Sequence, residues 1–132
     1  MLNTLADAIK AHLELAYPFK TVDMGFTKRV LQSPPSAAFF LIDDEGVDDT
    51  RPYLRRLTWE IALLASYVDP VKGVREMHDI IDAVRPSFSE WVPVAAGCLP
   101  TAAPRFHCEG VEDTLLIYTG RVVMQAVPAN IS

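Results

Sequence analysis

Two pairs of side chains have the residue types and the spacing of metal ligands. His78 and Asp82 are four residues apart in a segment with helical periodicity, which places both on one face of a helix. His107 and Glu109 alternate along a predicted strand, so they share one face of the sheet while Cys108 lies on the other. Each pair supplies only half of a metal site, and a solvated helix face or a cross-strand pair explains the same spacing. We therefore expect no metal and no other cofactor.

Recognisable catalytic motifs are missing from the sequence. It contains no GxSxG, P-loop, GxGxxG or HExxH motif. Cys98 and Cys108 are ten residues apart and match neither a CxxC motif nor a zinc framework, so we expect two free thiols. The chain is thus predicted not to be an enzyme. A small enzyme or ligand-binding domain that uses His78, Asp82 and His107 is kept as an alternative.

The most unusual charge pattern lies between two apolar segments. Residues 43–52 (DDEGVDDTRP) contain five of the 17 acidic residues, and a group of arginines follows the acids. Segregated charge of this kind does not build a core, so it indicates a surface that contacts a charged partner. The alternative is a solvated hairpin tip that only keeps the protein soluble. The predicted contact residues are Asp43, Asp44, Glu45, Asp48, Asp49, Arg51, Arg55 and Arg56.

Length and composition predict one domain over residues 1–132, because a chain of this size with 50% hydrophobic residues can build a single core. The net charge of −5 argues against a protein that binds nucleic acid specifically through its phosphates. No apolar run approaches the ~18 residues that span a bilayer, and the N-terminus lacks the basic start of a signal peptide. We expect a soluble cytoplasmic protein without a membrane partner.

The longest apolar segment, residues 53–68, has the periodicity of a strand and also that of a helix. We favour the strand, in which Trp59 is a core anchor. A fully extended strand of this length would reach roughly 50 Å, whereas a domain of this size has a radius of gyration of about 14 Å. The strand is therefore expected to bend or to protrude, with the acidic segment at its tip. The preceding segment, residues 36–42, is predicted to be a strand buried on both faces.

The remaining elements follow from apolar periodicity and from Pro and Gly. Helices are predicted over 4–16 and 72–84, the second ended or kinked at Pro86. A short strand is predicted over 20–24, an ambiguous segment over 26–32, a loop over 92–103 and a terminal hairpin over 105–110 and 114–126, with Gly120 as a possible bulge. The predicted fold class is α+β, with two main helices packed on one face of a largely antiparallel sheet with long strands.

The order of these elements resembles that of the phage tail terminator proteins. The resemblance rests on the first helix (LADAIKAHL), the strand before the charged segment (AAFFLIDDEG), the arginine-led strand (RRLTWEIALLASY), the helix REMHDIIDAVR and the final hairpin (FHCEGVEDTLLIYTGRVVMQ). It covers about the whole chain as a pattern of elements. In place of the family's glycine-rich turn before the last hairpin, this chain has residues 99–104 (LPTAAP).

The resemblance implies a structural role in virion assembly. Such a protein forms a ring, expected to be hexameric and monomeric when free, that ends the tail tube, contacts the tube protein and offers a docking face to the head connector or neck protein. DNA passes through such a ring without being bound specifically. The implied location is the host cytoplasm during assembly and then the virion. A head-closure or neck adaptor protein is the alternative with the same ring logic.

Overall fold

Five strands form one mixed sheet in the order β1-β2-β3-β5-β4. The computed structural model describes residues 1–47 and 54–132. The elements in chain order are α1 (Leu2–Ala16), β1 (Thr21–Met24), α2 (Lys28–Gln32), β2 (Ser36–Gly46), β3 (Arg55–Ser66), α3 (Pro70–Ser87), β4 (Phe106–Glu112), β5 (Leu115–Ala126) and a short 3₁₀ turn, η1 (Pro128–Asn130). Only β1 and β2 are parallel, and the other neighbouring strands are antiparallel. The predicted α+β class is confirmed.

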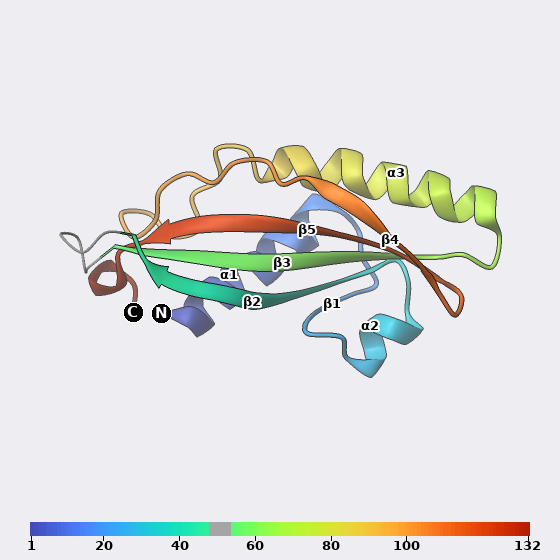
Figure 1. Cartoon of the computed structure of the whole chain (residues 1–132), viewed down its shortest axis with the longest axis horizontal. Helices are drawn as coiled ribbons and strands as arrows, with labels where there is room; N and C mark the ends of the chain where they lie inside the picture. Colours follow the sequence, from blue (N-terminus) through green and yellow to red (C-terminus); the bar gives the residue numbers. More distant parts are fainter. Residues whose placement is uncertain (48–53) are drawn as a thin grey trace.

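Helices α1 and α3 cover the same face of the sheet (Figure 1), where α1 passes behind the strands. The stripe of Leu5, Ile9 and Leu13 on α1 is fully buried in the main core, as the apolar periodicity predicts. Helix α3 begins at Pro70 after the Asp69 cap, whose side chain accepts a hydrogen bond from the Lys72 backbone N–H. It continues past Pro86 to Ser87, so the predicted end before this proline was too early.

Strand β3 is the centre of the sheet and confirms the strand prediction over its 12 residues, Arg55–Ser66. It pairs with β2 from Leu64 to Arg55 and with β5 along its whole length. At ~3.3 Å per residue it spans roughly 40 Å, and the molecule is elongated in the same direction (Figure 1). The expectation that this strand pair protrudes as a tip is wrong for the described residues, because β5 accompanies β3 as far as Arg55.

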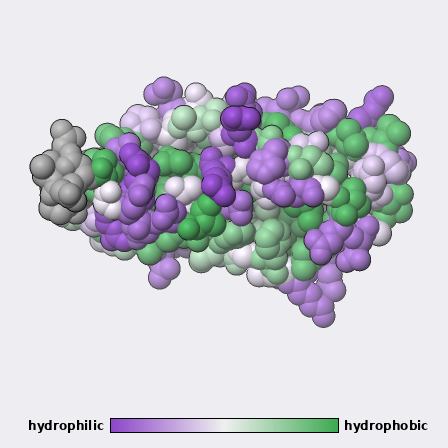
Figure 2. All heavy atoms as spheres, viewed as in Figure 1, coloured by the Kyte–Doolittle hydropathy of each residue, from purple (hydrophilic) through white to green (hydrophobic). Residues whose placement is uncertain are grey.

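The two faces of the sheet differ in how much of them is covered. On the side away from α1 and α3, α2 covers only one end, where Val30 packs against Ala38, Ala62, Leu64 and Leu115. Nearer the β2–β3 turn, no described helix lies over this side, and we call this area the open face. Figure 2 shows hydrophobic and hydrophilic side chains interspersed across the side turned to the viewer. The open face consists of Phe40, Ile42, Asp43, Glu45, Arg56, Thr58, Glu60, Arg121, Val123 and Gln125.

Burial along β2 follows from this partial cover. Ser36 to Phe39 are buried, but Ile42 is 38% exposed, so the prediction of a strand buried on both faces was right only for its first half. The strand also runs further than predicted, to Gly46, and so includes the first three acids of the charged segment. These acids therefore belong to a sheet strand and not to a loop.

Register irregularities occur at two places, between Leu41 and Asp43 in β2 and between Cys108 and Gly110 in β4. Gly120 is not a bulge, because β5 pairs with β3 in unbroken register through it. A Cβ at this position would lie 2.7 Å from the Phe106 ring, so the glycine lets Phe106 pack closely across the strand pair. The extra residue in β2 is Ile42, and it decides where the following acids point.

The segment between α3 and β4 has no regular structure, as predicted, but it is firmly attached. The Leu99 backbone N–H donates to the Gln125 carbonyl oxygen at 3.0 Å, and Cys98 forms an isolated bridge with Ala126. The buried Thr101 hydroxyl donates to the Phe88 carbonyl oxygen at 2.6 Å. The segment therefore runs beside the end of β5 that β4 leaves unpaired. No helix in the described ranges is long and apolar enough to cross a membrane.

Candidate interaction surface

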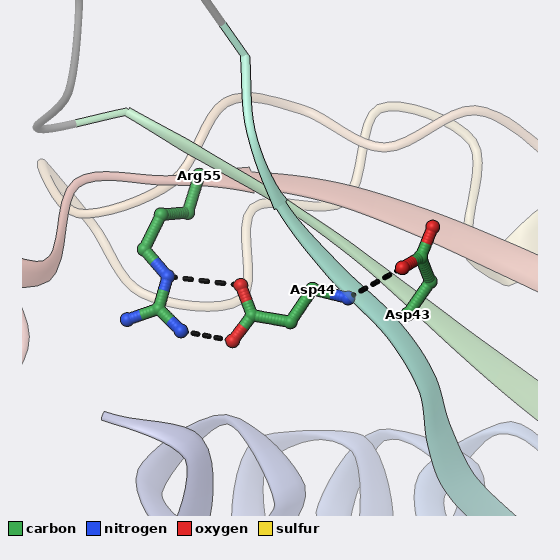
Figure 3. Close-up of polar contacts among 3 residues, drawn as sticks. All are labelled: Asp43, Asp44 and Arg55. Atoms are coloured by element: carbon green, nitrogen blue, oxygen red, sulfur yellow. Dashed lines mark hydrogen bonds and ion pairs between the residues drawn. The ribbon is translucent and has the colours of Figure 1, made fainter.

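Asp44 and Arg55 form a two-pronged ion pair at the end of the β2–β3 hairpin (Figure 3). The Arg55 Nε donates to Asp44 Oδ1 at 2.9 Å, and Nη2 donates to Oδ2. The hydrogen bond to Asp44 raises the pKa of the Arg55 guanidinium. Asp44 lies opposite Leu57, whose side chain is buried in the main core, so this pair is on the helix side of the sheet.

Glu45 and Arg56 form the second ion pair, with Oε1 and Nη1 3.0 Å apart. The two residues lie directly opposite each other on β2 and β3, and both are on the open face. Ile42 explains the arrangement, because one extra residue reverses the alternation of every later side chain in β2. Asp44 and Glu45 are consecutive, so the two ion pairs lie on opposite faces of one hairpin, and the bulge decides which pair lies on which face.

Asp43 also faces the open face, opposite Thr58. Its Oδ1 accepts a hydrogen bond from the Asp44 backbone N–H at 3.0 Å, and the two carboxylates point apart (Figure 3). Five of the predicted contact residues therefore lie together, while Asp48, Asp49 and Arg51 are outside the described residues. Two of the acids in this charged segment are paired in the structure, since Asp44 and Glu45 each bind an arginine of β3. Their contact with a partner stays a prediction.

A groove of about 580 Å³ lies at the opposite edge of the open face, between β5 and the segment before β4. Its lining includes the basic side chains Arg105, His107 and Arg121, and its apolar part includes Pro104 and Val123. We call this feature the basic groove. The hairpin register creates it, because Phe106 lies opposite Gly120 and the two arginines flank that pair. Sequence reasoning missed the groove, although the pairing of β4 with β5 contained the signal.

His107 and Glu109 share one face of β4 as predicted, with Nε2 and Oε1 2.6 Å apart. Thr119, across the strand pair on β5, donates from its hydroxyl to Glu109 at 2.5 Å. These hydrogen bonds, first that from Thr119 and then that from His107, lower the pKa of Glu109. Among the described residues, no group of three His, Cys, Asp or Glu side chains is placed to bind a metal ion. The cluster is thus a cross-strand polar network.

His12 and Ser87 are the described pair that most nearly resembles a base and a nucleophile, with Nε2 and Oγ 3.0 Å apart. The Ser87 hydroxyl donates its hydrogen to the Val84 carbonyl oxygen at 2.5 Å, so it accepts the hydrogen bond from His12. Burial lowers the pKa of His12. The ring packs between Phe88 and Trp91, which fixes the end of α3 against α1. The hydrogen-bond directions make this pair a structural contact.

The remaining side chains that the sequence singled out lie on different elements and differ in burial. His78 and Asp82 are both exposed on α3. Both cysteines are free, Cys98 half-buried and Cys108 exposed. Trp59 is 2% exposed in the core, as predicted for the anchor of β3.

Comparison with known proteins adds no relative to these observations: no protein-family model matches the sequence, and no curated protein matches it.

Proposed function

We propose that this protein is a structural virion assembly protein that caps a phage tail tube as a ring and helps to join the tail to the head. The open face is the observation that carries the proposal. Val123 is 45% exposed and Ile42 is 38% exposed on this face, and Phe40 and Thr58 are half-buried beside them. A partner surface that covered this side of the sheet would bury these apolar groups.

The composition of the open face suits a contact between folded subunits. Apolar side chains alternate there with Arg56, Glu60 and Arg121, which keep the free protein soluble. Interfaces of this mixed kind form after folding, because neither partner exposes a large apolar patch beforehand. This suits subunits that fold separately and then assemble into a ring.

The charged hairpin end gives the proposed ring its partner contacts. Exposed charges set the orientation and the rate of association more than its strength. These charges would contact a neighbouring copy, the tube protein, or the head connector or neck protein. The predicted contact residues are Asp43, Asp44, Glu45, Asp48, Asp49, Arg51, Arg55 and Arg56. Acids that line a ring would also repel DNA from its wall during passage.

The proposal is tested by deleting the gene for this protein from the phage genome that would encode it and imaging the particles by electron microscopy. We expect tails of irregular length and unjoined heads, both corrected when the wild-type protein is supplied in trans. Normal particles without the protein would refute the proposal. If the heads are unjoined but the tails have normal length, the result would support the head-closure alternative.

A variant protein supplied in trans tests the hairpin end alone. Reversing the charges of Asp44, Glu45, Asp48 and Asp49 should prevent correction in trans while the protein still folds. If this variant supports tails of normal length that join heads normally, the hairpin end is not a contact surface. The matched control reverses acids on an exposed part of α3, Asp79 and Asp82.

A further inference from the structure

We propose that the basic groove of one copy binds the acidic edge of β2 from a second copy, so that copies join side by side. The inference rests on the proposed function, a ring, and deepens it by naming the two surfaces in contact. In this contact, the acids of one copy pair with Arg105 and Arg121 of the neighbouring copy. Arg55 and Arg56 cannot serve as freely, since each already binds an acid of its own hairpin.

The basic groove carries two arginines that form no ion pair with the described residues. Both of them, Arg105 and Arg121, are exposed. The third basic side chain of the groove, His107, is bound to Glu109. Guanidinium groups bind carboxylates through paired hydrogen bonds, so the chemistry of the groove selects a carboxylate-bearing partner.

The free edge of β2 supplies the carboxylate. Strand β1 ends opposite Phe39, so among the described residues the stretch from Phe40 to Gly46 pairs only with β3. Asp43 lies on this stretch and faces the open face. Acidic side chains on a free edge also discourage uncontrolled strand pairing, which leaves charge as the means of contact.

The two surfaces lie at the same level along the strands but at opposite edges of the sheet. Asp43 is opposite Thr58, and Thr58 is opposite Val123, which lines the basic groove. Two strand spacings of ~4.8 Å separate Asp43 from Val123. A sideways step from one copy to the next therefore brings the acidic edge to the groove. Repetition of such a heterologous contact gives a ring when the rotation closes.

Apolar groups strengthen the same contact. Ile42 is adjacent to Asp43, and Val123 is two residues from Arg121, so the sideways step covers both exposed side chains together. One contact would therefore bury the exposed apolar side chains of the open face. A nucleic acid is the less favoured occupant, because the chain carries a net charge of −5 and Glu60 lies directly across the strands from Arg121.

The test is a charge swap read out by sedimentation equilibrium at low ionic strength, where exposed charges are least screened. Wild-type protein should self-associate. Asp43→Lys alone and Arg121→Glu alone should each weaken association by about tenfold or more. The two changes in one chain should restore most of it. Arg105→Glu gives a second reversal in the groove away from Glu60, and Lys10→Glu on the exposed side of α1 is the matched control.

Three results would overturn the inference. These are a wild-type monomer at every concentration reached, association that neither reversal changes, or a loss in both single variants without recovery in the double variant. Arg121→Glu that lowers binding of a labelled DNA duplex while association is unchanged would assign the groove to nucleic acid instead. Circular dichroism confirms that each variant is folded.

The outcome separates this contact from the proposed function. If the protein is needed for normal tails but the charge swap has no effect, only the assignment of surfaces is wrong. If the swap behaves as expected but particles lacking the protein are normal, the contact holds and the role in tail assembly is wrong.

Discussion

His12 of α1 and Trp91, which follows α3, stack with their ring centroids 4.2 Å apart and their planes 27° from parallel. The same histidine ring lies 4.5 Å from the Phe88 ring and donates a hydrogen bond to Ser87. One half-buried imidazole thus joins the first helix to the end of the last helix. Its protonation state is therefore linked to the stability of the fold.

We expect the free energy of unfolding to fall as the pH drops below about 6.5. Burial lowers the pKa of His12 from its ordinary value of 6.5, so the folded protein favours the neutral ring. Below that value the unfolded chain takes up the proton first, and the loss is complete once the pH is below the folded pKa. Urea unfolding at a series of pH values measures it. His12→Gln should flatten this dependence, and His78→Gln, at an exposed position on α3, should leave it unchanged.

The Asp44–Arg55 pair should contribute little to stability despite its two-pronged geometry. Both side chains are partly exposed, 24% for Asp44 and 35% for Arg55, and such pairs are typically worth about 0–1 kcal/mol. A double-mutant cycle with Asp44→Asn and Arg55→Gln, measured by urea unfolding, should give a coupling within this range that shrinks with added salt. A coupling well above ~1 kcal/mol, unaffected by salt, would contradict this account.

Trp59 should tolerate a change to Phe far better than a change to Ala. Its side chain is buried against Phe39, and its Nε1 has no hydrogen-bond partner in the described part of the chain. Trp59→Ala should destabilise the protein by about 3–5 kcal/mol through the cavity it leaves. Trp59→Phe loses less volume and removes an unpaired N–H whose burial costs about 1–3 kcal/mol. Thermal or urea unfolding compares the two, and equal losses would count against the unpaired N–H.

Gly73 should resist the substitution that usually stabilises a helix. Replacing a glycine within a helix by alanine typically gains up to about 1 kcal/mol. In α3, however, the added Cβ would collide with the Ser66 backbone oxygen and approach Tyr67 Cδ2 at 3.3 Å. We expect Gly73→Ala to destabilise the protein by about 1–3 kcal/mol. Gly46→Ala, where the Cβ would meet open space, is the control and should change unfolding by less than about 0.5 kcal/mol.

Local patterns in the sequence determined the elements themselves. The stripe of Leu5, Ile9 and Leu13 predicted α1, because apolar periodicity reflects the geometry of a single helix or strand. The segment around Trp59 fitted both periods, and the strand was the favoured of the two interpretations. The terminal hairpin and the shared face of His107 and Glu109 followed from the same rule. Short α2 was ambiguous, since one turn of helix carries too little periodicity to be recognised.

Only the tertiary structure decided how those elements meet. Ile42 becomes a bulge through the register of β2 against β3, and that register sends Asp44 to the helix side and Glu45 to the open face. The basic groove likewise exists only because pairing of β4 with β5 brings Arg105 beside Arg121. Strand order and register depend on contacts between residues far apart in the chain, which no local period encodes. The sequence alone therefore located the charges of this protein, and the fold determined which of them pair within the chain and which remain exposed.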